Sequence, residues 1–150
     1  MSHSFVSQHI HCVFSAKNRE PWITPNIREN LYQFIGGIAN KNKFKVIAVD
    51  GIDNHIHILL SLPSDISLSK AAQLIKGGSS YWIHKTYPEK SYFTWQEGYG
   101  AFSVGISQIK KTKEYIANQE NHHRTQTFQE EFIQFLKKHE IQYNENNGWG

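Results

Sequence analysis

The sequence predicts an α+β fold, in which helices cover a ferredoxin-like (RRM-like) antiparallel sheet and a further helix follows at the carboxyl-terminal end. The first observation is the order of the elements, because alternating and helical apolar patterns succeed one another as strand, helix, strand, strand, helix, strand. The second is size, since 150 residues with 39% hydrophobic side chains suit a single domain spanning residues 1–150. In this order, right-handed crossovers place the first and third strands side by side at the centre of the sheet.

The first strand and the first helix are distinguished by the spacing of their apolar residues. Residues 5–14 alternate in polarity, which is typical of a half-buried strand. Thr24 is a good N-cap and Pro25 a good first helical residue, and apolar side chains then recur at helical spacing to about Asn40. We therefore expect a strand over residues 5–14 and a helix that begins at Pro25.

A hairpin carries the second and third strands. Residues 43–50 and 54–60 both have the pattern of strands, and the short turn between them contains Gly51. Ser67 can cap the helix that follows, because its hydroxyl can accept a hydrogen bond from a backbone N–H of the first turn.

Two glycines interrupt this second helix without ending its apolar stripe. Gly77 and Gly78 each make a helix less favourable by about 1 kcal/mol, so we expect their presence here to have a structural or functional cause. Two interpretations remain open: the glycines break the helix, or they allow a phosphate backbone to approach beside Lys76, with Ser79 and Ser80 as donors.

The last third of the chain predicts one more strand and two more helices. Phe128, Phe132 and Leu136 stand at i, i+4 and i+8, as on the apolar face of a helix, and the chain then becomes polar. In order, we expect a strand over residues 99–106, a helix over 107–122, a helix over 127–139 and a polar tail over 143–150.

Composition restricts the class of protein. Sixteen basic and thirteen acidic side chains leave a net charge of +3, which permits a nucleic-acid partner without proving one. No apolar run approaches 18 residues, so we expect no membrane span. The amino-terminal residues have no signal-peptide pattern and Cys12 is the only cysteine, so we expect a cytoplasmic protein without disulfides.

Two histidines on the third strand are the main functional signal. Because a strand repeats every two residues, His55 and His57 share one face while Ile56, Ile58 and Leu60 fill the other. Two imidazoles on a rigid strand form half of a divalent-metal site. The alternative is a pair of polar side chains on a solvated face.

A second pair with the same spacing lies on the first strand. The expected strand order brings His9 and His11 close to His55 and His57. Spacing alone does not say which pair holds a metal.

A tyrosine and a glutamine on the helix over 107–122 supply the remaining chemistry. Tyr115 and Gln119 are four residues apart, so they share one helical face. If that helical face packs toward the histidine strand, Gln119 completes a three-ligand metal site with His55 and His57. Tyr115 can then attack a phosphate that the metal polarises. Tyr115 as a packing residue is the alternative, and His122, near the same face, is either a further ligand or a helix-capping side chain.

These segments together resemble the single-tyrosine transposases of the HUH superfamily, including the REP-associated tyrosine transposases. Asp53-Asn54-His55-Ile56-His57-Ile58-Leu59-Leu60-Ser61-Leu62-Pro63 is similar to the histidine strand of that family, and Tyr115-Ile116-Ala117-Asn118-Gln119 to its nucleophile helix. Segments 73–80 and 95–100 fall where the family carries similar sequence. The resemblance covers nearly the whole chain.

The resemblance implies a transposase that cleaves and rejoins single-stranded DNA at hairpin-marked ends. It implies that His55, His57 and Gln119 bind Mg²⁺ or Mn²⁺, and that Tyr115 forms a 5′-phosphotyrosine link and releases a 3′-OH. It favours His55 and His57 over the second histidine pair. It also implies a homodimer, in which the tyrosine helix of one subunit can complete the metal site of the other.

Contacts to DNA and the rival functions are less well defined. Lys76, Lys111 and Arg19 are candidate DNA contacts, although solvated basic side chains are the ordinary alternative. Aromatic residues such as Trp22 and Trp95 can stack on bases or belong to the core. The alternatives to a transposase are a non-catalytic single-strand-binding module, a domesticated relative acting on genomic palindromic repeats, and a metal-dependent hydrolase.

Overall fold

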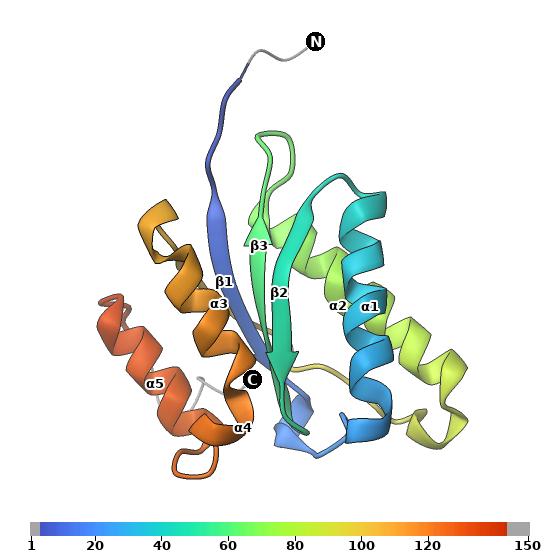
Figure 1. Cartoon of the computed structure of the whole chain (residues 1–150). Helices are drawn as coiled ribbons and strands as arrows, with labels where there is room; N and C mark the ends of the chain where they lie inside the picture. Colours follow the sequence, from blue (N-terminus) through green and yellow to red (C-terminus); the bar gives the residue numbers. More distant parts are fainter. Residues whose placement is uncertain (1–3, 144–150) are drawn as a thin grey trace.

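The computed structural model describes residues 4–143 and contains a four-stranded antiparallel sheet (Figure 1). The strand order is β2-β3-β1-β4, so the first and third strands are central, and the expected ferredoxin-like topology is confirmed. The strands are β1 (His9–Ser15), β2 (Lys45–Gly51), β3 (His55–Ser61) and β4 (Gly100–Ser103).

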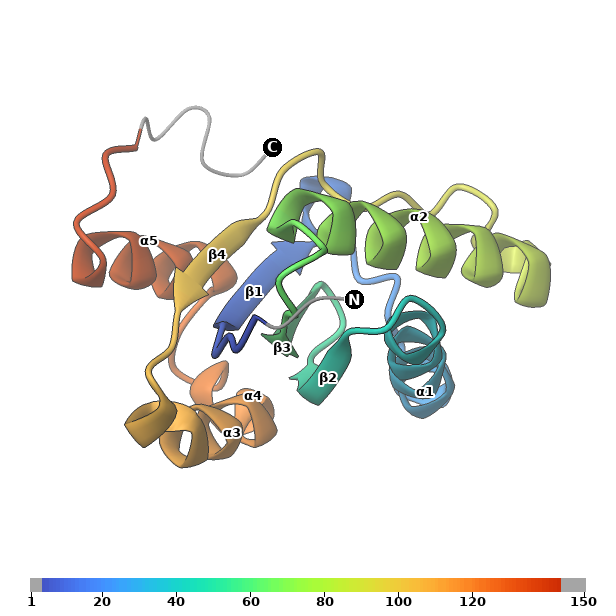
Figure 2. The same ribbon diagram turned by 90° about the horizontal axis from the view of Figure 1, so that it is seen from above.

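Helices cover both faces of the sheet. Figure 2 shows α1 and α2 on one face, and α3, α4 and α5 on the other. Among residues 4–143, no helix is both long and apolar enough to cross a bilayer. The helices are α1 (Pro25–Lys41), α2 (Leu68–Thr86), α3 (Ile109–Ala117), α4 (Gln119–His122) and α5 (Phe128–Lys138), with short 3-10 turns at Lys17–Arg19, Pro88–Lys90 and Ile106–Gln108.

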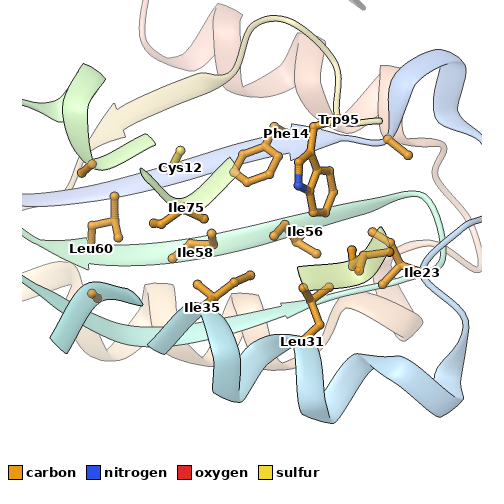
Figure 3. Close-up of a cluster of buried hydrophobic side chains, with 14 of the residues drawn as sticks. Cys12, Phe14, Ile23, Leu31, Ile35, Ile56, Ile58, Leu60, Ile75 and Trp95 are labelled. Carbon is orange, nitrogen blue, oxygen red and sulfur yellow. The ribbon is translucent and has the colours of Figure 1, made fainter. Parts of the chain in front are cut away.

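The main core lies between the sheet and helices α1 and α2. Ile56 and Ile58 of β3 are fully buried there, against Leu31 of α1 and Ile75 of α2 (Figure 3). Trp95 also belongs to this core, and its Nε1 donates to Ser79 Oγ at 3.0 Å. Trp95 is therefore a packing residue in this structure.

The alternation of β3 puts the histidines on the opposite face, as expected. His55 and His57 are both fully buried between the sheet and helices α3 to α5. A second, smaller apolar cluster lies beside them, where α5 packs on the sheet. It consists of Val13, Phe102, Phe128, Phe132 and Leu136.

Three predicted boundaries are wrong. The first strand begins at His9, and Phe5 is 98% exposed, because β3 ends opposite His9 and Pro63 beyond it has no N–H to extend the ladder. The fourth strand is limited to Gly100–Ser103, the residues that pair with β1. The helix expected over residues 107–122 is divided at Asn118, whose φ of −111° and ψ of 29° are non-helical.

The glycines of α2 do not break the helix, which runs unbroken from Leu68 to Thr86. A Cβ at Gly78 would lie 2.8 Å from Cδ1 of Ile38, so this glycine allows α1 and α2 to pack closely. Ser79 Oγ donates to the carbonyl of Ile75 at 2.6 Å and is buried, so it serves the helix. The predicted polar tail, apart from Tyr143, lies outside the described residues.

Gly100→Ala tests how tightly α5 packs on the sheet. A Cβ at Gly100 would lie 2.4 Å from Cε2 of Phe132 and 3.2 Å from Cε2 of Phe102, so two rings must shift. We expect urea denaturation to show a free energy of unfolding about 1 to 3 kcal/mol lower, the usual effect of overpacking. The control is Gly98→Ala, where a Cβ meets no atom within 4 Å. Equal stability of Gly100→Ala and wild type would contradict this packing.

Candidate functional site

Each histidine of β3 is held through one ring nitrogen. His55 Nδ1 lies 2.8 Å from Asn54 Oδ1, and His57 Nδ1 lies 2.7 Å from His11 Nε2. Val13 of β1 is paired with His57, which places His11 diagonally across from it on the same face. With Nδ1 engaged, each ring presents Nε2 toward the helices above the sheet.

The carboxylate of Glu131 meets these Nε2 atoms. Oε1 of Glu131 lies 2.9 Å from His57 Nε2, 3.2 Å from His123 Nε2 and 3.4 Å from His55 Nε2. Glu131 comes from α5 and is only 1% exposed, while His123 follows α4 directly. A buried carboxylate is stable only with such partners, so this cluster contributes to the position of α5 beside the apolar contacts of that helix.

Tyr115 of α3 joins the same carboxylate. Its hydroxyl donates to the second oxygen of Glu131, Oε2. The ring of His122 stacks on the Tyr115 ring with centroids 4.3 Å apart, so His122 packs against the tyrosine instead of joining the cluster of ligand atoms. Glu131 thus connects the phenol to three imidazoles.

Gln119 begins α4 and is fully buried beside His55. Its Oε1 lies 3.3 Å from His55 Nε2, and its Nε2 donates to the carbonyl of Tyr115 at 3.3 Å. Tyr115 and Gln119 are therefore adjacent in space even though the helix is divided between them at Asn118.

Burial and hydrogen bonding set the charges of the cluster. Burial lowers the pKa of His55 to about 4 and the pKa of His11 to about 3, so both rings are neutral near pH 7. Burial alone would raise the pKa of Glu131, but hydrogen bonds from the imidazoles hold that pKa far below its ordinary value. Burial would lower the pKa of His123, but Glu131 raises it. Burial and the Glu131 charge raise the pKa of Tyr115.

The cluster has the composition of a metal site. His55, His57, His123 and Glu131 each offer one ligand atom, and these atoms all lie within 4.8 Å of one another. Imidazole nitrogens and carboxylate oxygens are ordinary ligands of divalent transition metals, and an ion here would balance the buried negative charge. The residues present therefore fit a divalent cation.

The structure brings together six residues that the sequence singled out: His11, His55, His57, Tyr115, Gln119 and His122. It adds Glu131 and His123, which sequence reasoning missed. For Glu131 a signal existed, because it stands on the apolar face of the predicted terminal helix, where a carboxylate needs a partner. For His123, in a polar segment between helices, the sequence offered no such signal.

A cleft opens beside Tyr115. Its volume is about 580 Å³, and basic and aromatic side chains line it. Lys111 of α3 and Lys138 of α5 are both exposed and stand on its walls, and His11 connects it to the histidine cluster. The lining includes His11, Phe102, Lys111, Tyr115, Phe135, Lys138 and His139.

The other two predicted DNA contacts lie elsewhere. Lys76 is on the opposite face of the sheet, and its Nζ donates to the carbonyls of Gln96, Glu97 and Gly98 at 2.6, 3.0 and 2.9 Å. Arg19 lines a separate depression of about 480 Å³ together with His123 and Arg124. The structure therefore groups Lys111 with Tyr115, Arg19 with His123, and Lys76 with neither.

The chain is similar to several transposases. The family model described as "Transposase IS200 like" matches residues 4–119. The ISDra2 transposase TnpA of Deinococcus radiodurans is 24% identical over 114 residues, 73% of this chain and 81% of that protein. A crystal structure described as a transposase of Deinococcus radiodurans R1 aligns with a TM-score of 0.66 and 18% identity, covering 79% of this chain and 95% of that one.

A further similar structure is a REP-associated tyrosine transposase bound to a REP hairpin. It aligns with a TM-score of 0.62 and 15% identity, and the alignment covers 82% of this chain and 73% of that chain. At these identities the two solved structures support the fold, and the family match extends through Gln119 but stops before His123 and Glu131.

Lys76→Met separates a structural role from DNA contact. The substitution leaves three carbonyls without their ammonium donor, so we expect the free energy of unfolding to fall by about 1.5 to 3 kcal/mol. Chemical denaturation measures it, with the exposed Lys111→Met as control, expected within about 0.5 kcal/mol of wild type. Unchanged stability of Lys76→Met would show that the ammonium does not anchor the segment over 96–98.

Proposed function

The chain belongs to the family of IS200-like transposases, and we propose that it cleaves and rejoins single-stranded DNA with Tyr115 as the nucleophile. Family membership makes it a DNA-processing enzyme; the nucleophile, the intermediate and the DNA structure are our proposal. The observation that carries it is the position of the Tyr115 hydroxyl, hydrogen-bonded to Glu131 beside three imidazoles.

In the proposed reaction, the Tyr115 oxygen attacks a backbone phosphorus. A bond forms between phosphorus and the phenolic oxygen, and the bond from phosphorus to the 3′ oxygen breaks, which leaves a 5′-phosphotyrosine and a free 3′-OH. Glu131 Oε2 accepts the hydroxyl hydrogen and so orients the phenol for this attack. The phenolic proton is lost as the bond to phosphorus forms, and the leaving 3′ oxygen takes up one proton, so the step balances. The reverse attack by another 3′-OH rejoins a strand, so no nucleotide cofactor is needed.

We propose that His55 and His57 bind Mg²⁺ or Mn²⁺, with the Gln119 oxygen as the predicted third ligand. When bound, the ion supplies a Lewis acid that polarises the scissile phosphate. The protein holds this site ready, because Asn54 and His11 fix the orientation of the two rings.

We propose that the single strand passes through the cleft beside Tyr115. Lys111 and Lys138 supply positive charge on two walls, and the rings of Phe102 and Phe135, stacked with centroids 5.1 Å apart, supply an aromatic surface. The DNA-bound relative carries a REP hairpin, so a hairpin next to the cleaved strand is the proposed substrate. Arg19, near His123, and Lys76 stay predicted contacts.

Two points of the proposal concern assembly. The homodimer implied by the resemblance stays a prediction, which light scattering on the purified protein tests. Tyr115 lies beside His57 of its own chain, with ring centroids 5.8 Å apart, and we propose that cleavage occurs within one subunit. A non-catalytic binding module is the second candidate, but it gives no use for a half-buried tyrosine hydrogen-bonded to a buried glutamate and histidine cluster.

Replacing Tyr115 by Phe tests the nucleophile. Labelled single strands carrying hairpins from both flanks of the gene are incubated with Mg²⁺ or Mn²⁺ and separated on a denaturing gel. We expect wild type to form a covalent adduct that needs metal, and Tyr115→Phe to form none while its DNA affinity stays within a few-fold. The matched control is Tyr92→Phe, since Tyr92 is 85% exposed.

An adduct with Tyr115→Phe would assign the nucleophile to another residue. Tight DNA binding without an adduct in wild type would favour the binding module. His55→Ala, tested in parallel, should abolish the adduct because it removes a proposed ligand of the ion.

Lys111→Met combined with Lys138→Met tests the DNA path. For single strands, each phosphate contact contributes about −0.7 to the slope of log K against log salt concentration. Losing two contacts should therefore make the slope of the double variant less steep by roughly twice that amount. Fluorescence anisotropy at several salt concentrations measures the slope. The control is Lys70→Met, an exposed lysine on α2, on the other face of the sheet. An unchanged slope for the double variant would place the DNA outside this cleft.

A further inference from the structure

We infer that Glu131 and His123 are themselves ligands of the divalent ion, so that helix α5 is part of the metal site. The ion would then be held by three imidazole nitrogens and one carboxylate oxygen, in place of the two imidazoles and the Gln119 amide expected from the sequence. The inference deepens the proposed function, on which it rests for the presence of an ion.

The first argument is geometric. With metal–ligand bonds of about 2.1 Å, neighbouring ligand atoms of one ion lie about 3.0 to 3.4 Å apart. Glu131 Oε1 lies 2.9, 3.2 and 3.4 Å from the Nε2 atoms of His57, His123 and His55. The separations from His123 and His55 fall within this range, and the 2.9 Å separation from His57 lies just below it.

The second argument distinguishes Glu131 from Gln119. Gln119 Oε1 approaches one imidazole, that of His55 at 3.3 Å, whereas Glu131 Oε1 approaches all three. Gln119 also donates to the Tyr115 carbonyl, so its amide is fixed to the backbone that carries the tyrosine. The geometry therefore makes Glu131 the central oxygen donor and Gln119 a neighbour that orients His55.

The third argument is charge. Glu131 is 1% exposed, and its partners His55 and His57 are fully buried. Removing a carboxylate from water is costly unless a positive charge lies beside it, and a divalent cation bound by these residues would supply that charge.

The fourth argument is that α5 is built to hold Glu131 in place. Thr127 and Glu130 form a reciprocal capping box at its first turn. Phe128 and Phe132, on either side of Glu131, are buried against the sheet. The carboxylate thus projects from a fixed helix, as a ligand must.

The donor set also predicts which ion binds best. Imidazole nitrogens favour Zn²⁺, Co²⁺ and other transition metals over Mg²⁺, which prefers oxygen ligands and retained water. We therefore expect Mn²⁺ to bind more tightly than Mg²⁺, and Co²⁺ and Zn²⁺ more tightly than Mn²⁺.

Metal titration without DNA tests the inference. The full chain is freed of metal with a chelator and dialysed, and binding of Mn²⁺ and Co²⁺ is measured by calorimetry for wild type, Glu131→Gln, Gln119→Ala and Glu130→Gln. Glu130→Gln is the matched control, because glutamine preserves the capping box at the neighbouring position. We expect Glu131→Gln to weaken binding at least 10-fold, Gln119→Ala to weaken it less, and Glu130→Gln to bind as wild type.

The visible spectrum of bound Co²⁺ is the second measurement, compared between wild type and Glu131→Gln. If Glu131 binds the ion, replacing its carboxylate changes the d–d bands, whereas identical spectra of Co²⁺ in the two proteins would overturn the inference. So would wild-type affinity in Glu131→Gln, a larger loss in Gln119→Ala, or no metal binding by wild type. Because no DNA is present, failure of the DNA-cleavage proposal leaves these results unaffected, and the two failures are distinguishable.

Discussion

The structure on one face of the sheet depends on a single buried carboxylate. Removing an ionised carboxylate from water costs several kcal/mol unless polar partners surround it. Glu131 finds imidazoles on β3 and after α4, and a phenol on α3. Since these partners stand on separate elements, one side chain from α5 links the helices of that face to the histidine strand.

Strand β3 contributes side chains to both faces of the sheet. Its isoleucines enter the apolar core under α1 and α2, while its histidines enter the polar cluster under α3 to α5. The core holds the strand rigid, and its central place between β1 and β2 brings His11 of β1 within reach of His57. A site that requires ligand positions within about 0.5 Å benefits from such a support.

The fold was largely predictable, because it depends on local periodicity and on the order of elements. The alternation of apolar and polar residues along the third strand predicted that His55 and His57 share one face of the sheet. The separation of four residues along a helix predicted that Tyr115 and Gln119 lie side by side. Glu131 and His123 were not predicted as site residues, because their role depends on α5 folding back across β1 and β3, which no local pattern specifies. The division at Asn118 was missed for a related reason: it accompanies the burial of Gln119 against His55, a contact between distant parts of the sequence.

The position of Glu131 late in the chain has a consequence for biosynthesis. The ribosome completes the histidine strand and the tyrosine helix before it adds residues 128–138, so a nascent chain carries Tyr115 and both β3 histidines without their carboxylate. The site is assembled only when α5 has been translated and has docked on the sheet. If Glu131 belongs to the metal site, as we propose, that site is complete only after nearly all of the described chain has been translated.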